Sequence, residues 1–381
     1  MEMDAEVGII GVGTMGSMAA WQLAKRGVSV LGFEQYGLGN DRTAAGGESR
    51  LFRTAYMEGS EYVPLLQNAK ELWRGLEKES GNSLLTLNGG LMIAEEDSPV
   101  IRNILKSISD FNLSHEILKE DKARTRYPQF TFYDNDLIIF DKEAGFIRPE
   151  LAVVSASLLA KKYGAEIKRF TKVEHVSSEN GGVSIITDDG KTYKVGKLLI
   201  STGAWTSKLI SEWKEKLIPR RLLLTWFAPK DPVHTKPDKF PIFARMRGDF
   251  RLTGAPTLEG TMVKASYTKD PLAIEDPEKL NRDVYPKELE KISESVEALL
   301  PVLFPDPVRA SAYMDAYTPD DHALLGELPN WDNVFVASGF SGHGFKLSPV
   351  IGKIIAELMI DGKTESNINH LDPGRMLRKV E

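Results

Sequence analysis

The sequence predicts a two-domain α/β protein, and three observations point to this fold class. A strand, a glycine-rich turn, a helix and a second strand occur within the first 34 residues. A second glycine-rich stretch follows a buried strand near the C-terminus, and strands dominate the long region between the two. We therefore expect one α/β domain assembled from separated segments, with a second domain inserted into it.

The hydrophobic periodicity predicts the elements in chain order. The first unit consists of a strand at residues 6–10, a helix at 16–25 that ends at Gly27, and a strand at 28–33. Further helices are predicted at residues 62–79, 100–112, 151–164, 286–300 and 348–361. Further strands are predicted at residues 89–94, 183–187, 192–195, 197–201 and 334–337, with a hairpin turn at residues 188–190.

The first glycine-rich turn has the spacing of a Rossmann-like dinucleotide-binding loop. It reads Gly11-Val12-Gly13-Thr14-Met15-Gly16, and Glu34 ends the following strand. Gly11 allows the tight turn, Gly13 lets a pyrophosphate approach the backbone, and Gly16 lets the helix pack on the strand. Glu34 is expected to accept hydrogen bonds from the ribose hydroxyls, and its charge disfavours NADP. The spacing fits FAD and NAD equally, and a glycine turn without a ligand is the remaining alternative.

Composition and charge exclude several classes of function. The 381 residues have a formal net charge of −6 and no basic run typical of nucleic-acid binding. The absence of cysteine excludes disulfides, thiolate metal ligands and covalent attachment through a thiol. The six histidines show no metal-ligand spacing, so we expect no metal. Without a membrane-length apolar run or a basic N-terminal segment, we expect a cytoplasmic protein, and we expect it to be monomeric.

The second glycine-rich stretch contains a histidine and a lysine that a flexible turn would not need. It reads Ala337-Ser338-Gly339-Phe340-Ser341-Gly342-His343-Gly344-Phe345-Lys346. Such a loop exposes backbone N–H groups and lets a flat ligand come close. With this loop the sequence resembles the monomeric sarcosine oxidase and N-methyltryptophan oxidase family of FAD amine oxidases over nearly the whole chain. The other segments that carry the resemblance are residues 11–16, 48–56, 61–64 and 201–205, Lys264, and residues 318–322.

The resemblance implies FAD as the cofactor and a glutathione-reductase-type FAD-binding domain with an inserted α+β substrate domain on a mixed sheet. The FAD-binding domain would comprise residues 1–85, 145–215 and 320–381, and the substrate domain residues 86–144 and 216–319. The expected cofactor-binding residues are Gly11, Gly13, Thr14, Met15, Gly16, Glu34, Ser49, Arg50, Val173, Thr202, Gly203, Gly342, His343, Gly344, Phe345 and Lys346.

The resemblance also implies roles for the basic residues. Arg53 and Lys346 match the pair that holds the substrate carboxylate, and a guanidinium fork beside an ammonium suits that group. Lys264 matches the lysine that activates dioxygen, Arg50 a basic residue near the flavin ring, and His343 part of the loop around it. We expect these last three to be catalytic. From the sequence alone, Arg53 could equally form a surface ion pair, and Lys264 could be a solvated strand lysine.

Several positions depart from the family pattern. Tyr313 stands six residues before Pro319, where the family carries the cysteine that links FAD, so we expect non-covalent FAD. Thr268 stands where a histidine usually lies beside the substrate amine. Thr253 and Asp315 replace aromatic pocket residues and are expected to contact the substrate. Asp315 would favour a polar or cationic substituent, with a turn-capping aspartate as the alternative.

The implied reaction is the oxidation of an N-substituted α-amino acid by FAD. The product is an imine that water hydrolyses, and dioxygen is reduced to hydrogen peroxide. A fructosyl amino acid oxidase is an alternative, because it shares Arg53, Lys346 and the loop at residues 342–346. A dehydrogenase with another electron acceptor is a second alternative, against which Lys264 argues. A flavin-binding protein without turnover is a third, against which the carboxylate pair argues.

Overall fold

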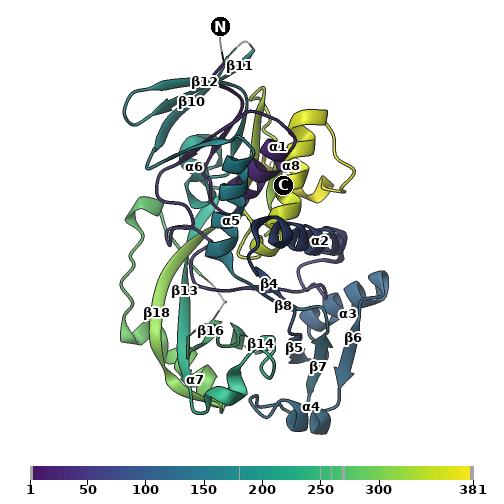
Figure 1. The fold of residues 1–381 in the computed structure, drawn as a ribbon. Helices are drawn as coiled ribbons and strands as arrows, with labels where there is room; N and C mark the ends of the chain where they lie inside the picture. The colour runs from purple at the N-terminus through teal and green to yellow at the C-terminus, as the bar shows by residue number, and fades with distance from the viewer. Residues whose placement is uncertain (1–2, 180, 249, 259, 268–270, 378–381) are drawn as a thin grey trace.

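The chain folds around two large sheets, as the α/β prediction requires. The computed structural model describes residues 3–179, 181–248, 250–258, 260–267 and 271–377. In Figure 1 the first sheet and its helices occupy the upper part of the molecule, and the second sheet occupies the lower part. Chain segments that connect the two large sheets form a small three-stranded sheet. Its strands are β3 (Arg50–Phe52), β4 (Leu85–Thr86) and β8 (Gly145–Ile147).

The first sheet has eight strands and a parallel centre in the order β9-β2-β1-β12-β20. The hairpin of β10 and β11 pairs with the first half of β12, and β19 pairs antiparallel with β20. The strands are β1 (Ala5–Ile10), β2 (Val30–Glu34), β9 (Glu166–Arg169), β10 (Val173–Glu179), β11 (Gly182–Thr187), β12 (Thr192–Ile200), β19 (Leu324–Glu327) and β20 (Val334–Ser338).

The two ends of the chain meet on this sheet. Helix α1 (Thr14–Lys25) ends before Gly27, which has a φ of +82°, as the sequence predicts. Helix α8 (Ser348–Asp361) packs on α1 through Gly352, where an added Cβ would lie 2.5 Å from the Met18 carbonyl carbon. Figure 1 shows the two helices side by side. Since β1 and β20 run parallel, the glycine-rich loops that follow them lie at the same edge of the sheet.

The second sheet has nine strands in the order β17-β13-β16-β15-β14-β5-β7-β6, and β18 pairs with β13. It is mixed, because β14 pairs parallel with β5 whereas the other pairs are antiparallel. The strands are β5 (Gly90–Glu95), β6 (His115–Leu118), β7 (Asp136–Asp141), β13 (Ile218–Pro229), β14 (Ile242–Arg247), β15 (Phe250–Ala255), β16 (Val263–Tyr267), β17 (Leu272–Ala273) and β18 (Leu303–Tyr317).

The remaining helices cover these sheets or connect them. Helix α5 packs on α1, and α7 packs on β18. The remaining α-helices are α2 (Val63–Ser80), α3 (Pro99–Phe111), α4 (Glu120–Arg126), α5 (Pro149–Lys162), α6 (Thr206–Leu209) and α7 (Pro286–Leu299). The 3-10 helices are η1 (Ser60–Tyr62), η2 (Gly203–Trp205), η3 (Ser211–Trp213), η4 (Pro232–Thr235), η5 (Pro277–Lys279), η6 (Phe345–Leu347), η7 (Asn369–Leu371) and η8 (Pro373–Leu377).

One predicted break is wrong. The strands expected at residues 192–195 and 197–201 form the single strand β12. The strand changes its pairing near Val195, from β11 on one side to β1 on the other, and Gly196 allows β1 to approach closely. We propose that the two large sheets mark two domains with the boundaries predicted from the sequence.

Candidate functional site

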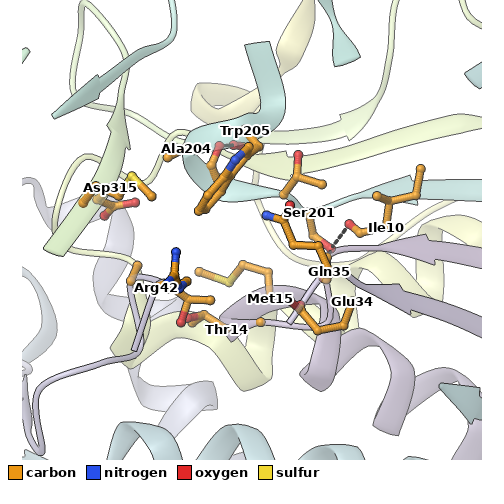
Figure 2. A pocket seen from close by; sticks show the side chains of 18 of the residues that line it. Ile10, Thr14, Met15, Glu34, Gln35, Arg42, Ser201, Ala204, Trp205 and Asp315 are labelled. Carbon is orange, nitrogen blue, oxygen red and sulfur yellow. Dashed lines mark hydrogen bonds between the residues drawn. The ribbon is translucent and has the colours of Figure 1, made fainter. Parts of the chain in front are cut away.

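A cavity of about 480 Å³ lies along the edge of the first sheet where the two glycine-rich loops meet. In Figure 2, Glu34 lies at one end of this cavity and Asp315 at the other, with Met15 and Trp205 between them. The Glu34 carboxylate is buried and accepts hydrogen bonds from Val12 N at 3.1 Å and Tyr36 N at 3.0 Å. Burial raises the pKa of Glu34, whereas these two N–H groups lower it.

The glycines of the first loop are required for different reasons. An added Cβ at Gly11 would lie 2.7 Å from Ser201 O, and one at Gly16 would lie 2.0 Å from Gly11 O. Protein packing therefore excludes a side chain at both positions. At Gly13 the same atom would meet only Thr43 Cγ2, at 3.8 Å, although Gly13 lines the cavity. Its lack of a side chain keeps space free for a ligand.

Unsatisfied polar groups also fit a dinucleotide here. Thr14 Oγ1 and Trp205 Nε1 are buried and have no hydrogen-bond partner among the described residues, and both residues line the cavity. Helix α1 begins at Thr14 without a side-chain cap, so its terminal N–H groups suit a phosphate. The glycine-lined cavity can thus hold the pyrophosphate at α1 and a ribose at Glu34.

A second cavity, of about 640 Å³, lies between the first cavity and the second sheet. Six residues line both cavities, which therefore meet at Ala44, Arg50, Met314, Asp315, Gly342 and Phe345. A flat ring reaching from the glycine-lined cavity to this junction would have one face toward the larger cavity. Every residue predicted to be catalytic or to bind substrate lines the larger cavity: Lys264, Arg50, His343, Arg53, Lys346, Asp315 and Thr253.

Arg53 and Lys346 both lie against the ring of Tyr56. The Arg53 guanidinium carbon is 5.7 Å from the centre of the Tyr56 ring, and Lys346 Nζ is 4.9 Å from it. Both charged side chains are buried. Burial and the charge of Arg53 lower the pKa of Lys346 to about 7.

Glu58 already occupies part of this basic pair. Its Oε1 accepts a hydrogen bond from Arg53 Nη2 at 2.9 Å, while Arg53 Nε and Nη1 have no partner among the described residues. Burial alone would raise the pKa of Glu58, but the charges of Arg53 and Lys346 outweigh it and lower the pKa. A carboxylate that enters the cavity can use the two free donors of Arg53 or displace Glu58.

His343 has both ring nitrogens engaged. Nε2 lies 2.9 Å from Asp321 O, an acceptor, so Nε2 carries the proton and Nδ1 accepts from Tyr56 Oη at 2.8 Å. Burial lowers the pKa of His343, which favours this neutral ring. Lys346 Nζ donates to Tyr56 Oη at 3.3 Å and to His343 O at 3.0 Å. His343 therefore fixes Tyr56, and Tyr56 in turn contacts Lys346.

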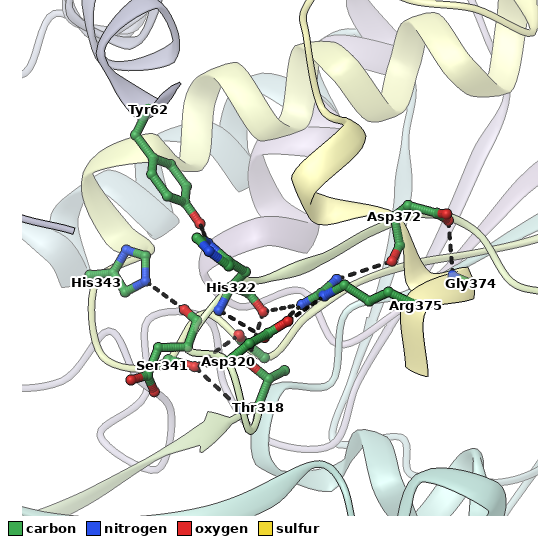
Figure 3. A network of polar contacts seen from close by, with 11 residues as sticks. Tyr62, Thr318, Asp320, His322, Ser341, His343, Asp372, Gly374 and Arg375 are labelled. Atoms are coloured by element: carbon green, nitrogen blue, oxygen red, sulfur yellow. Dashed lines mark hydrogen bonds and ion pairs between the residues drawn. The ribbon is translucent and has the colours of Figure 1, made fainter. Parts of the chain in front are cut away.

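A polar network that includes Arg375 of the C-terminal segment holds the loop whose Asp321 carbonyl accepts the hydrogen bond from His343. Figure 3 shows Arg375 paired with Asp320, with Nε 2.9 Å from Oδ2, and donating to His322 O. On the other side, Tyr62 Oη lies 2.8 Å from His322 Nδ1. Thr318 Oγ1 donates to His322 O at 2.8 Å and closes the loop.

Lys264 and Arg50 are held by backbone carbonyls. Lys264 Nζ donates to Gly47 O at 3.0 Å and Ser49 O at 2.8 Å, which leaves one of its three donors for the cavity. Arg50 donates to Ser49 O and Ala44 O. Burial and the Arg50 charge lower the pKa of Lys264 well below its ordinary value.

Asp315 connects β18 to the second glycine-rich loop. Its Oδ1 accepts from Ala316 N at 2.8 Å and its Oδ2 from Gly342 N at 3.0 Å. Burial raises the pKa of Asp315 to about 6, against these N–H groups and Arg50. The side chain caps the loop, as one of the two alternatives from the sequence has it, and also lines both cavities.

The other positions expected at the site are distributed as follows. Ser49 lines the larger cavity rather than the glycine-lined one, as do His343 and Lys346, and Gly16 lines neither. The buried Tyr313, at the position that matches the family's linking cysteine, lines the larger cavity, and its ring packs against Gly46. Thr268 lies outside the described residues.

The sequence did not single out several residues that the structure brings into the cavities. Glu58, Tyr56 and Arg220 line or contact the larger cavity, and Trp205 and Arg42 line the other. Glu58 follows Arg53 by five residues. This short separation was the signal in the sequence that the two side chains could pair. Nothing in the strand pattern distinguishes Arg220 from Arg221.

The described residues contain neither a metal-binding cluster nor a membrane-spanning helix. No group of three or more His, Asp or Glu side chains in that part of the chain could hold a metal ion. None of the helices there is long and apolar enough to cross a membrane.

Comparisons with known proteins identify the family of the chain. A family model described as FAD dependent oxidoreductase (DAO) matches residues 6–358. The chain is 33% identical over 376 residues to a monomeric sarcosine oxidase of Streptomyces avermitilis, with 97% of each chain covered. It is 30% identical over 361 residues to an N-methyl-L-tryptophan oxidase of Salmonella dublin, with 94% of this chain and 95% of the other covered.

Solved structures share the fold over almost the full length. NikD, an unusual amino acid oxidase of nikkomycin biosynthesis, matches with a TM-score of 0.86 at 22% identity, covering 98% of each chain. L-proline dehydrogenase from P. horikoshii matches with a TM-score of 0.86 at 21% identity, covering 99% of each chain. These matches confirm the predicted fold class and the family resemblance. The chain therefore belongs to the DAO family of FAD-dependent oxidoreductases and is an amino acid or amine oxidase of the sarcosine oxidase type.

Proposed function

We propose that the protein oxidises N-substituted α-amino acids to imines, which hydrolyse to an aldehyde and an amine, and that it reduces dioxygen to hydrogen peroxide. One observation carries the proposal. The buried pair Arg53 and Lys346 lies in a cavity that meets the glycine-lined cavity at Arg50 and Asp315. A substrate carboxylate on this pair would hold the adjacent C–N bond beside the cofactor ring.

The carboxylate pair orients the substrate. Arg53 Nε and Nη1 are free donors within the described residues, and Lys346 is fixed by Tyr56 and His343 O. Charge-assisted bonds to both would fix the α-carbon in position, since a guanidinium and an ammonium constrain a carboxylate from two directions. We propose that His343 acts by holding Tyr56 and Lys346, because neither ring nitrogen is free to take a proton.

The substrate would react as the neutral amine. Of the three acids that line the cavity, Glu58 pairs with Arg53, which lowers its pKa, and Asp315 accepts from two backbone N–H groups. Both interactions stabilise the carboxylate and make these two acids weak bases toward the amine. Bound FAD supplies the two-electron acceptor for the C–H bond and passes the electrons to dioxygen. Lys264 would stabilise the negative charge that develops on oxygen, because its third N–H is unused by the backbone.

FAD would be held without a covalent bond. The chain has no cysteine, and the phenol of Tyr313 packs on Gly46 at the position where relatives carry the linking thiol. Acid precipitation of the holoenzyme should therefore leave a white pellet and a yellow supernatant. A yellow pellet would contradict non-covalent binding.

Anaerobic flavin bleaching tests the substrate class. The panel is sarcosine, N-methyltryptophan, pipecolate and fructosyl-valine. Each compound is compared with a matching primary amino acid or with its own decarboxylated analogue. An N-substituted amino acid should bleach the flavin absorbance, and its decarboxylated analogue should not. Faster bleaching by primary amino acids, or by amines without a carboxylate, would contradict the proposal.

A further inference from the structure

Arg220 lies on the wall of the larger cavity that the second sheet provides. On β13, Arg220 and the three leucines at 222–224 line the cavity, and so do Asp315 and Tyr313, the β18 partners of Arg220 and Leu222. Arg220 does not line the glycine-lined cavity. Its guanidinium therefore faces the space for substrate and not the space for the dinucleotide.

Within the described residues, the guanidinium of Arg220 has almost no hydrogen-bond partners. Its Nε is buried without a hydrogen-bond partner among the described residues, and Nη1 makes one long contact, 3.4 Å to Pro271 O. Its carbon lies 5.2 Å from the centre of the Tyr317 ring. Asp315 is its direct cross-strand neighbour, but both Asp315 oxygens are used by backbone N–H groups.

The next residue shows how different this is from an ordinary arginine of the same strand. Arg221 points to the other face and donates to Asn281 O and Asp283 O, both at 2.9 Å, and pairs with Glu288. Arg220 itself is half-buried, but its buried Nε lacks such an acceptor, which is costly unless a ligand supplies one. The tyrosine ring beside Arg220 holds the guanidinium plane without using its donors.

The charge around the larger cavity favours an anion beyond the one that Arg53 and Lys346 would hold. Three acidic residues line it, Glu58, Asp315 and Asp321, and the first two are already paired or hydrogen-bonded. The cationic residues that line it are Arg50, Arg53, Arg220, Arg251, Lys264 and Lys346. Arg53 and Lys346 belong to the wall near the glycine-rich loops, whereas Arg220 belongs to the sheet.

We infer that Arg220 binds a second carboxylate of the substrate. The substrate class is then N-substituted amino acids with an additional carboxylate, either on the side chain or on the N-substituent. This inference rests on the proposed function, in which Arg53 and Lys346 hold the α-carboxylate. It goes beyond it by assigning the far end of the substrate.

Binding of non-oxidisable acids tests Arg220 without turnover. Isothermal titration of the holoenzyme would compare succinate, glutarate and adipate with their monoamides, which differ only in the second charge. At least one diacid should bind about tenfold or more tightly than its monoamide, as a charged hydrogen bond implies. Arg220→Gln should remove this difference. Arg221→Gln is the matched control, and it should keep the difference although it loses more protein contacts. Equal binding of every diacid and its monoamide would overturn the inference, as would an unchanged difference in Arg220→Gln.

Flavin reduction then separates this inference from the proposed function. N-methyl-L-glutamate and N-methyl-L-aspartate, beside N-methyl-L-glutamine and N-methyl-L-asparagine, test a side-chain carboxylate. N-(carboxymethyl)-L-alanine beside its N-carbamoylmethyl analogue tests a carboxylate on the N-substituent. Faster reduction by the charged member of either set, lost in Arg220→Gln, supports the inference. Equal or faster reduction by the neutral members overturns it while the proposed function stands. If no N-substituted amino acid reduces the flavin, the proposed function fails, and the inferred substrate class fails with it.

Discussion

Arg53 Nη2 lies 2.9 Å from Glu58 Oε1 inside the larger cavity, so the arginine proposed to bind the substrate already has an internal carboxylate partner. Glu58 thus competes with the substrate for Arg53. In the Glu58→Gln variant this competition is removed, and a carboxylate ligand should bind about tenfold more tightly. Methoxyacetate, which resembles sarcosine but has an ether in place of the amine, is a suitable probe.

The titration is best made at several pH values from 5 to 7, because Lys346 has a pKa of about 7 and the Glu58 charge that helps to raise this pKa is lost in Glu58→Gln. Glu61→Gln is the control, because Glu61 is exposed and does not line the cavity. Unchanged or weaker binding in Glu58→Gln would show that Glu58 does not compete with the ligand.

Ligand affinity should depend on pH through Lys346. Burial and Arg53 lower the pKa of Lys346 to about 7, so the free enzyme loses this positive charge as the pH rises through 7. Since a carboxylate prefers the protonated lysine, the affinity for methoxyacetate should be highest near pH 6 and fall at higher pH. The fall should approach tenfold for each pH unit above 7.

Lys346→Met separates this titration from others. Asp315, at the junction of the cavities, also titrates in this range. Its pKa is about 6, so it becomes negatively charged as the pH rises through 6. The variant should bind methoxyacetate weakly at pH 6 and show little further loss up to pH 9. An affinity of the unmodified enzyme that stays constant from pH 6 to pH 9 would contradict the proposed role of Lys346.

Lys264→Met should separate the two half-reactions. Reduction of the flavin by substrate should change only a few-fold, because Lys264 takes no part in binding the carboxylate. Reoxidation by air should slow about 100-fold or more, the scale of losing one preorganised charge at a developing anion. Stopped-flow absorbance follows both steps, and Lys264→Arg should retain part of the oxygen reaction. Equal losses in both steps would refute the assignment to oxygen.

Glu34→Gln should weaken FAD binding and the fold together. The glutamate accepts from Val12 N and Tyr36 N with separate oxygens, and an amide has only one acceptor oxygen. One buried N–H group is then unsatisfied, at a cost of about 1–3 kcal/mol in the free energy of unfolding. The dissociation constant of FAD, measured by recovery of flavin fluorescence, should rise about tenfold or more. Glu174→Gln is the control, because Glu174 lines the same cavity but is exposed. Equal FAD binding in both variants would argue against the role of Glu34.

The sequence predicted those parts of the fold that depend on local patterns. The unit from β1 to β2 follows from two short runs of apolar residues, the glycine turn and Gly27, all of which act over a few residues. The break predicted within β12 was wrong because a strand can change its neighbours along its length, which no local pattern encodes. The pairing of β13 with β18, which forms a wall of the larger cavity, joins residues far apart in the sequence.

The site was predictable only as far as the motifs reach. Arg53, Lys264 and Lys346 came from family resemblance, and the structure brings them to one cavity. Glu58 and Arg220 were not predicted. Glu58 matters because it pairs with Arg53, and Arg220 because its Nε has no hydrogen-bond partner among the described residues; both are properties of the folded chain. Burial and two backbone N–H groups fix the orientation of Asp315, which the sequence left open between pocket and cap.

A single-turnover experiment that measures stoichiometry tests whether the protein oxidises an N-substituted amino acid and reduces dioxygen to hydrogen peroxide. The holoenzyme is mixed without oxygen with one equivalent of the best N-substituted amino acid, and air is then admitted. One flavin should be reduced and one aldehyde released per substrate consumed, and one hydrogen peroxide should form as the flavin absorbance returns. A flavin that stays oxidised with every N-substituted amino acid, or one that is reduced but persists in air without forming peroxide, would contradict the proposed function.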